Sequence, residues 1–259
     1  MLENAWTARG GREALRAVRP LIDARARSRP VEVEEIAASP FLEFRVDGVT
    51  GRVPAVPGLE RFAETAAAVC RREAEPGPVA LLAQWDERAH QGAQEAARLA
   101  PAPLFWPARV ITGRDLPHAL GIGLGACVYF GHGHRGGWDG YWGIDAPTLI
   151  AAMLEPASVV FSLTCRGFSF SEDLVLGGYC AAAFASAGRT SHRRNRQLGL
   201  NLCRAMQQHR SLAAVLRNSQ ATWLSTLAYQ IVGDPLASLS GSPYAPARAA
   251  AIEQSFWRP

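Results

Sequence analysis

The sequence predicts an α/β fold in which a mostly parallel central sheet carries helices on both faces. Mainly apolar runs recur at 79–85, 126–130, 158–163 and 180–187, and stretches with helical periodicity separate them. A strand that is apolar at every position must be buried on both faces, as in a parallel sheet covered by helices. With 48% hydrophobic and 19% charged residues, the 259-residue chain has a globular rather than a disordered composition.

The first 75 residues are predicted to form a small N-terminal α+β extension. Apolar residues up to about residue 27 follow a helical spacing, and Pro20 is expected to kink or end that helix. Residues 41–48 alternate between apolar and polar and end in Asp47-Gly48, which predicts a strand and a hairpin turn. A helix is expected over 59–73. The break at 75–78, rich in Pro and Gly, then separates this extension from a main domain over residues 76–259.

The main domain is predicted to alternate strands with helices up to its end. Helices are expected at 94–99, 116–120, 148–154, 173–176 and 197–209, with a further apolar segment at 104–111. The Arg-rich residues 188–196 are expected to form an exposed loop, where proteolysis concentrates. A last strand is expected at 227–232, closed by a tight turn over 233–235 at the edge of the sheet.

Composition also limits the partners and the compartment. The N-terminal 30 residues are rich in Arg without a long apolar run, and no stretch reaches the roughly 18 apolar residues of a membrane span, so we expect a cytoplasmic chain without membrane contact. The net charge of +4 is dispersed, which argues against nucleic-acid binding. Five widely spaced cysteines are expected to be free thiols, and Cys127, Cys180 and Cys203 to be core residues.

Two strand ends contain residues of chemical interest. The apolar run 126–130 opens into Gly131-His132-Gly133, and the run 158–163 leads to Cys165. If the two strands are neighbours, His132 and Cys165 emerge at the same edge of the sheet, as a thiol nucleophile and its base require. The imidazole would raise the thiolate fraction and later protonate the departing amine. His134 is the alternative base.

The backbone around this pair suggests how an oxyanion would be stabilised. The N–H groups of Gly133 and Cys165 are natural donors to a tetrahedral oxyanion, and glycine at position 133 permits the close approach. We therefore predict an oxyanion hole formed by these two amides.

Three segments, in this order, resemble the gingipain-type C25 peptidases and, more broadly, the caspase-like cysteine peptidases. They are Gly131-His132-Gly133, Thr164-Cys165-Arg166-Gly167 and the closing Tyr229-Gln230-Ile231-Val232-Gly233-Asp234-Pro235-Leu236. The similarity covers roughly residues 78–240. It implies a three-layer caspase-like fold, a His132/Cys165 dyad, and cleavage chosen mainly by the side chain before the scissile bond. The resemblance implies no cofactor and no metal.

Candidate substrate-binding residues flank the dyad. Asp86 follows the strand at 79–85, where a carboxylate would pair with a basic residue, Arg above Lys, before the cleaved bond. The alternative for Asp86 is a helix cap. Trp138, Tyr141 and Trp142 either pack in the core or line a cleft, and Trp138 and His134 are included among the predicted substrate-binding residues.

Two other functions are compatible with the sequence. His132, His134 and Asp139 are possible ligands of a metal-dependent hydrolase, although the other histidines have no recognisable ligand spacing. An inactive caspase-like module that binds or scaffolds a partner is the non-enzymatic alternative. The expected partners are a protein or peptide substrate and a regulatory protein. If the enzyme prefers Arg, its own segment 188–196 becomes a candidate for self-processing.

Overall fold

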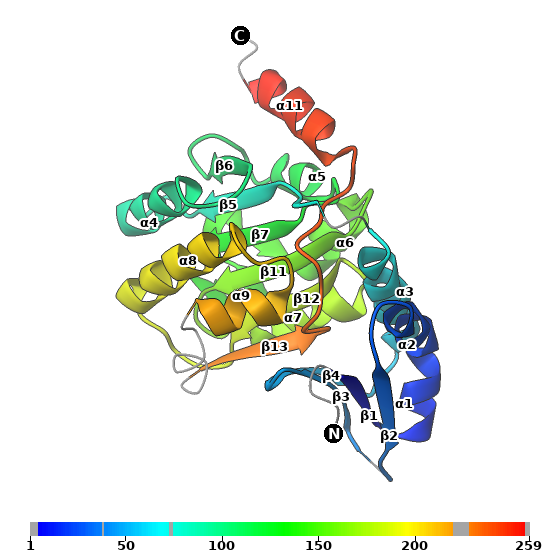
Figure 1. Ribbon diagram of the computed structural model, residues 1–259. Helices are drawn as coiled ribbons and strands as arrows, with labels where there is room; N and C mark the ends of the chain where they lie inside the picture. Colours follow the sequence, from blue (N-terminus) through cyan, green and yellow to red (C-terminus); the bar gives the residue numbers. More distant parts are fainter. Residues whose placement is uncertain (1–4, 38, 73–74, 220–227, 257–259) are drawn as a thin grey trace.

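A ten-stranded sheet runs through the whole molecule in the computed structural model, which describes residues 5–37, 39–72, 75–219 and 228–256 (Figure 1). The strand order is β2-β1-β3-β4-β13-β12-β11-β7-β5-β6. The strands β12, β11, β7, β5 and β6 are all parallel to their neighbours within this group. The mostly parallel sheet predicted from the sequence is therefore confirmed.

The continuous apolar runs form the centre of this sheet. Every residue is buried in β5 (Val79–Ala83), β7 (Ala126–Phe130), β11 (Ala157–Leu163) and β12 (Cys180–Ser186). The edge strand β6 (Pro103–Pro107) is only partly buried. Its two prolines lack the N–H that a central strand would need, which suits an edge position.

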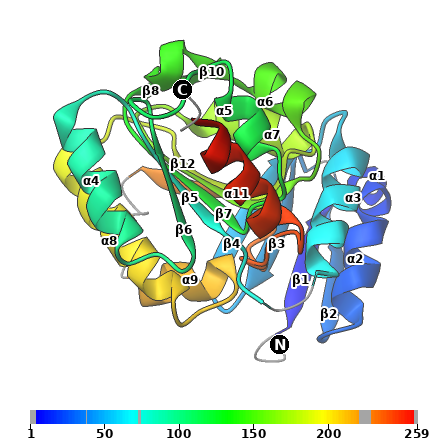
Figure 2. The same ribbon diagram turned by 90° about the horizontal axis from the view of Figure 1, so that it is seen from above.

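Helices cover both faces, which gives three layers (Figures 1 and 2). One layer contains α4 (Glu87–Ala97), α8 (His192–Met206) and α9 (Leu212–Asn218). The opposite layer contains α3 (Leu59–Cys70), α5 (Leu116–Leu120), α6 (Ala146–Ala152) and α7 (Phe168–Leu176). A last helix, α11 (Ala245–Phe256), projects from the far end of the molecule.

The N-terminal residues add four strands to the same sheet. These are β1 (Trp6–Gly10), β2 (Val31–Glu35), β3 (Phe41–Val46) and β4 (Val49–Pro54), and β4 pairs in parallel with β13 (Tyr229–Gly233). The hairpin at 41–48 is confirmed, with Asp47 and Gly48 in the left-handed region at φ 49° and 76°. Strands on both sides of residue 75 thus belong to one sheet.

Two short helices precede the hairpin in place of one long helix. They are α1 (Arg12–Ala17) and α2 (Arg19–Ala26), and Pro20 lies in the first turn of α2. Proline is tolerated there because the first N–H groups of a helix have no intrahelical partner. Pro20 therefore interrupts the helical segment, as expected, and a second helix begins beside it.

The closing Gly-Asp-Pro segment lies in the interior and not at the sheet edge. We expected an edge turn, but β13 lies between β12 and β4, and Asp234 is fully buried. Its carboxylate accepts hydrogen bonds from the Arg25 guanidinium of α2 and from Trp6 Nε1. The N-terminal strands extend the sheet beyond β13, and this ion pair joins the two parts of the chain.

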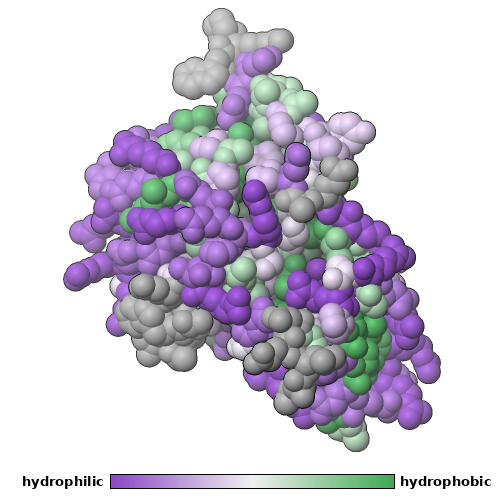
Figure 3. Space-filling view, viewed as in Figure 1, coloured by the Kyte–Doolittle hydropathy of each residue, from purple (hydrophilic) through white to green (hydrophobic). Residues whose placement is uncertain are grey.

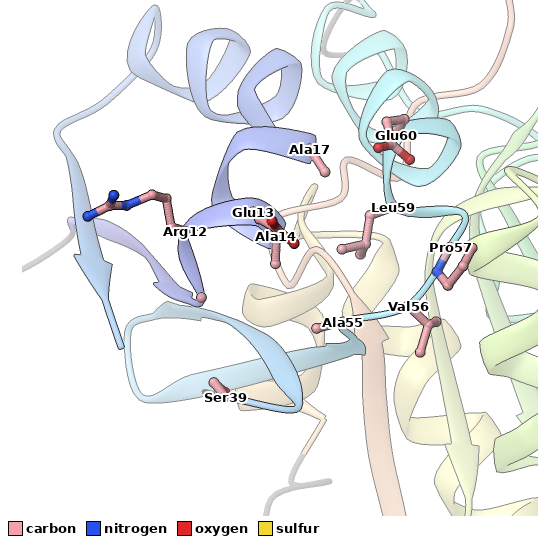
Figure 4. A pocket seen from close by; sticks show the side chains of 11 residues that line it. Arg12, Glu13, Ala14, Ala17, Ser39, Ala55, Val56, Pro57, Leu59 and Glu60 are labelled. Atoms are coloured by element: carbon pink, nitrogen blue, oxygen red, sulfur yellow. The ribbon is translucent and has the colours of Figure 1, made fainter. Parts of the chain in front are cut away.

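The surface has a hollow beside the N-terminal helix α1 and a hydrophilic face over α8. A hollow of about 530 Å³ lies between α1 and the segment that leads into α3 (Figure 4). Arg12 points away from it toward β2, where it pairs with Glu35.

Hydrophilic side chains dominate the surface over α8 (Figure 3). In the described part of the chain, no helix combines the length and the apolar character that crossing a membrane would require.

Candidate active site

His132 and Cys165 follow two neighbouring strands at the same edge of the sheet. β7 and β11 are parallel and in register up to the pair Phe130 and Leu163. A single residue, Gly131 or Thr164, separates this last pair from His132 or Cys165. Because paired strands lie roughly 5 Å apart, the two loops leave the sheet side by side.

Gly133 brings these two loops into contact. A Cβ atom at position 133 would lie 2.8 Å from Thr164 Oγ1 and 3.0 Å from Thr164 Cβ. Thr164 immediately precedes the cysteine and is fully buried, so it cannot easily move aside. Only glycine at position 133 permits this approach of the histidine loop to the cysteine loop.

Cys165 lies on a sharp turn beneath Thr190. The Thr190 N–H donates to Cys165 Sγ at 3.3 Å, and the Thr190 carbonyl and hydroxyl oxygens lie 3.5 and 3.6 Å from the same sulfur. Arg166 is left-handed at φ 55°, a conformation that costs a side chain of this kind about 1–3 kcal/mol. Its N–H donates to the Gly188 carbonyl. The chain thus reverses directly after the sulfur and enters α7.

A buried hydrogen-bond network supports the cysteine loop from behind. Asn195 Nδ2 donates to the Leu163 carbonyl at 2.8 Å and to Thr190 Oγ1 at 3.1 Å, and Tyr229 donates to Asn195 Oδ1 at 2.8 Å. These contacts join β11, α8 and β13. Asn195 and Thr190 were not predicted from the sequence, because both lie in the Arg-rich segment that was expected to be an exposed loop.

That segment is helical from His192 onward. Ser191 is the N-cap of α8 and accepts a hydrogen bond from the Arg194 N–H at 3.3 Å. The expected helix at 197–209 therefore begins earlier, and the expected loop at 188–196 is reduced to its first four residues. A serine followed by a helical pattern of Asn195, Leu198 and Leu202 was the local signal.

His132 is exposed on a well-anchored backbone. Its N–H donates to Gln84 Oε1 at 2.7 Å, and its carbonyl accepts from the Tyr129 hydroxyl at 3.0 Å. Its ring meets the His192 ring edge-on, with 4.8 Å between centroids. The side chains of Asp86, His132 and His192 offer ligand atoms that all lie within 4.8 Å of one another. His192 has no recognisable ligand spacing in the sequence, and it is the fold that brings it beside His132.

Asp86 caps a helix and also faces this cluster. It is the N-cap of α4, where Oδ1 accepts from the Arg88 N–H at 3.1 Å. Its second oxygen lies 3.9 Å from His192 Nδ1. The helix-cap alternative is therefore realised. One carboxylate oxygen still faces the site, because the cap contact uses only Oδ1.

The three aromatic residues Trp138, Tyr141 and Trp142 differ in their exposure to solvent. Trp138 is fully buried, donates to Ser162 Oγ at 2.8 Å and stacks on Tyr129. Its prediction as a substrate-binding residue is wrong, because its side chain fills the core. Tyr141 is also buried, whereas Trp142 is 85% exposed and packs on Trp85, with ring centroids 4.6 Å apart.

His134 turns toward its own hairpin. It lies in β8 (Gly133–His134), which pairs with β9 (Gly137–Trp138). Its Nδ1 accepts from the Gly136 N–H at 3.0 Å, and its Nε2 lies 3.6 Å from Asp139 Oδ1. Among the described residues, the ligand cluster that includes His132 contains neither His134 nor Asp139. The ligand set of the metal-hydrolase alternative is not assembled.

Burial makes the other four thiols less reactive. Cys127, Cys180 and Cys203 are buried, as expected. Burial raises the pKa of Cys127 and Cys180 far above the ordinary value and that of Cys203 to about 12. Burial also raises the pKa of the half-buried Cys70. Cys165 is partly exposed at the strand end where chemistry is expected.

Sequence comparisons match no family model and no curated protein. Solved structures do match. A structure described as a protease has a TM-score of 0.57 at 11% identity, over 70% of this chain and 53% of that chain. The complex of Porphyromonas gingivalis RgpB pro- and mature domains has a TM-score of 0.55 at 17% identity, over 70% and 53%. The Arg-specific cysteine proteinase gingipain R (RGPB) has 0.53 at 16%, over 69% and 53%.

These likenesses define the class of fold. The chain has a three-layer caspase-like α/β fold with a central, mostly parallel sheet. Within that class its fold resembles that of the gingipains, as the sequence motifs indicated. The matched region is about half the length of these proteins, and the low identities make it a likeness of fold.

Proposed function

We propose that this chain is a cysteine endopeptidase in which Cys165 is the nucleophile and His132 is the base. The observation that supports this most is the placement of both residues just beyond the paired ends of β7 and β11, with Gly133 packed against Thr164. A thiol and an imidazole at adjacent loop ends, next to backbone amides, are the parts that acyl transfer needs.

In the proposed reaction, His132 accepts the thiol proton and Cys165 Sγ forms a bond to the scissile carbonyl carbon. The N–H groups of Gly133 and Cys165 donate to the oxyanion that develops on the carbonyl oxygen. The C–N bond then breaks, and His132 passes its proton to the departing amine. Water hydrolyses the thioester and regenerates the thiol.

Thr190 prepares the sulfur for this role. Its N–H donates to Sγ at 3.3 Å, and this contact holds the sulfur in place at the end of the strand. Because Thr190 is held by Asn195, the donor has a fixed direction. The same contact places residue 190 over the nucleophile, so a substrate must share this space with the link between β12 and α8.

We further propose a preference for a basic residue, Arg above Lys, before the cleaved bond. Asp86 Oδ2, which the helix cap does not use, faces the site beside His192, and the guanidinium would meet it there. Trp85, which precedes Asp86 in the chain and is partly exposed, packs against the exposed Trp142, and the two rings offer aromatic faces on which a guanidinium stacks well. The Arg specificity named for gingipain R is consistent with this choice.

A fluorogenic peptide library, incubated with wild type, Cys165→Ala and His132→Ala, tests the function. We expect wild type to cleave, with Arg peptides fastest, and both variants to lose at least ~100-fold in rate because proton transfer and covalent catalysis are removed. His134→Ala tests the alternative base, and it is expected to remain active because its side chain lies in the same hairpin but faces Asp139.

Three results would contradict parts of this proposal. Loss of activity in His134→Ala together with retention in His132→Ala would make His134 the base. Cleavage after Asp, or only after apolar residues, would remove Asp86 from the pocket. A wild type that cleaves nothing and binds a partner equally well with Cys165→Ala would favour the inactive binding module.

A further inference from the structure

Asp86, His132 and His192 converge from three elements on one point at the edge of the sheet. Asp86 caps α4, His132 follows β7, and His192 is the first residue of α8. Two imidazoles and one carboxylate are the donor set that Zn²⁺ favours. We propose that this triad binds a zinc ion reversibly and that the bound ion blocks the peptidase by occupying His132.

The geometry needs only a small adjustment to hold the ion. The ligand atoms lie within 4.8 Å of one another, whereas Zn–N bonds of about 2.0–2.1 Å in a tetrahedral site place them roughly 3.4 Å apart. His132 is exposed and the other two side chains are about one-third exposed, so small side-chain rotations suffice. A fourth position would stay open to water.

The ligands are already oriented by contacts behind them. Asp86 uses Oδ1 for the α4 cap and leaves Oδ2 directed at His192. The backbone of His132 is fixed on both sides by Gln84 and Tyr129. Such outer contacts hold metal ligands in position and increase affinity. The N-terminal position of His192 in α8 opposes a cation, which makes a reversible inhibitory site more reasonable than a permanent one.

Occupation of His132 has a direct chemical consequence. The nitrogen that binds zinc has no lone pair left to accept the thiol proton, and the ion also covers the Asp86 oxygen proposed to meet a substrate guanidinium. The inhibitory consequence rests on the proposed peptidase function. The metal site itself does not, because it depends only on the three side chains.

Zinc chloride titrated calorimetrically into chelator-treated protein tests the site directly. We expect one ion per chain for wild type, for Cys165→Ser and for the matched control His134→Ala. His192→Ala should weaken binding by at least ~10-fold, because one of three ligands is lost. Cobalt(II) absorption adds a signature, since thiolate ligation gives an intense charge-transfer band that the His and Asp ligands would not produce.

Peptidase rates with and without zinc chloride, each relative to the variant's own metal-free rate, test the consequence. Wild type should be inhibited and recover with chelator, and His192→Ala should need at least ~10-fold more zinc. Absent binding in wild type, or binding lost in Cys165→Ser but kept in His192→Ala, would overturn the site. Binding as expected in a protein without peptidase activity would instead reject only the proposed function.

Discussion

At the residue scale, the five cysteines differ sharply in their surroundings, and this makes their reactivity testable. Iodoacetamide should modify Cys165 first and Cys70 more slowly, because burial raises the pKa of Cys70. Cys127, Cys180 and Cys203 should react only after unfolding, because they are buried as neutral thiols. Peptide mapping by mass spectrometry at increasing times measures this order.

His132→Ala serves as the control for activation, since modification of Cys165 should slow if the imidazole promotes thiolate formation. Equal rates at Cys165 and Cys203 in the folded protein would contradict the assigned environments.

Single residues also show what the sequence could and could not predict about the site. The placement of His132 and Cys165 at one edge of the sheet was predictable, because each follows a mainly apolar run and parallel strands present their ends at one edge. His192 was not, since its contact with His132 depends on where α8 begins relative to the sheet. Trp138 was misassigned because an aromatic residue in a Gly-rich hairpin looks identical whether it packs inward or outward.

At the scale of elements, the early start of α8 restricts self-processing to one bond. Of the arginines in residues 188–196, only Arg189 lies outside the helix, and it is exposed. The Thr190 carbonyl lies 3.5 Å from Cys165 Sγ, so the connection between β12 and α8 already runs beside the nucleophile. An Arg-specific enzyme that processes itself here should cut after Arg189, because the helical arginines would first have to unfold.

Intact mass after long incubation distinguishes the outcomes. Wild type and Arg193→Ala should yield the same two fragments, and Arg189→Ala and Cys165→Ala should stay whole. A cut after Arg193 or Arg194 would mean that α8 unravels at its start. A single wild-type mass in an active preparation would exclude self-processing.

Elements with a strong local pattern were predicted well, and weakly patterned ones were missed. The interior strands and the β3–β4 hairpin were recognisable from apolar runs and from Asp47-Gly48. β2 was not predicted, because its Val and Glu residues are largely exposed, which is typical of an edge strand. β1 was also missed. The pairing of β1 with β2 and that of β4 with β13 join segments distant in sequence, and local periodicity does not reveal such pairing.

At the scale of the whole molecule, the sheet connects the N-terminal strands to the strands that carry the site. β4 pairs with β13, and a Cβ on Gly51 would lie 2.1 Å from the Gly233 carbonyl oxygen, so the backbones approach closely. β13 in turn carries Tyr229, which holds Asn195 behind the cysteine loop. Loosening the N-terminal strands is therefore expected to weaken the support of Cys165 through β13.

The buried pair of Arg25 and Asp234 offers the sharpest test of that connection. Asp234 is fully buried and the Arg25 side chain is 7% exposed, so Asp234→Asn leaves a buried guanidinium without its counter-ion. Breaking a buried pair in this way typically costs about 3–5 kcal/mol of unfolding free energy. The asparagine oxygen still accepts from Trp6 and from the Leu236 N–H, which keeps the lost charge as the main change. Urea denaturation of Asp234→Asn should therefore show a much lower midpoint than wild type.

Arg19→Ala is the control, because the exposed Arg19–Asp23 pair contributes under about 1 kcal/mol. Equal midpoints for the two variants would show that the ion pair does not hold the N-terminal strands to the rest of the sheet.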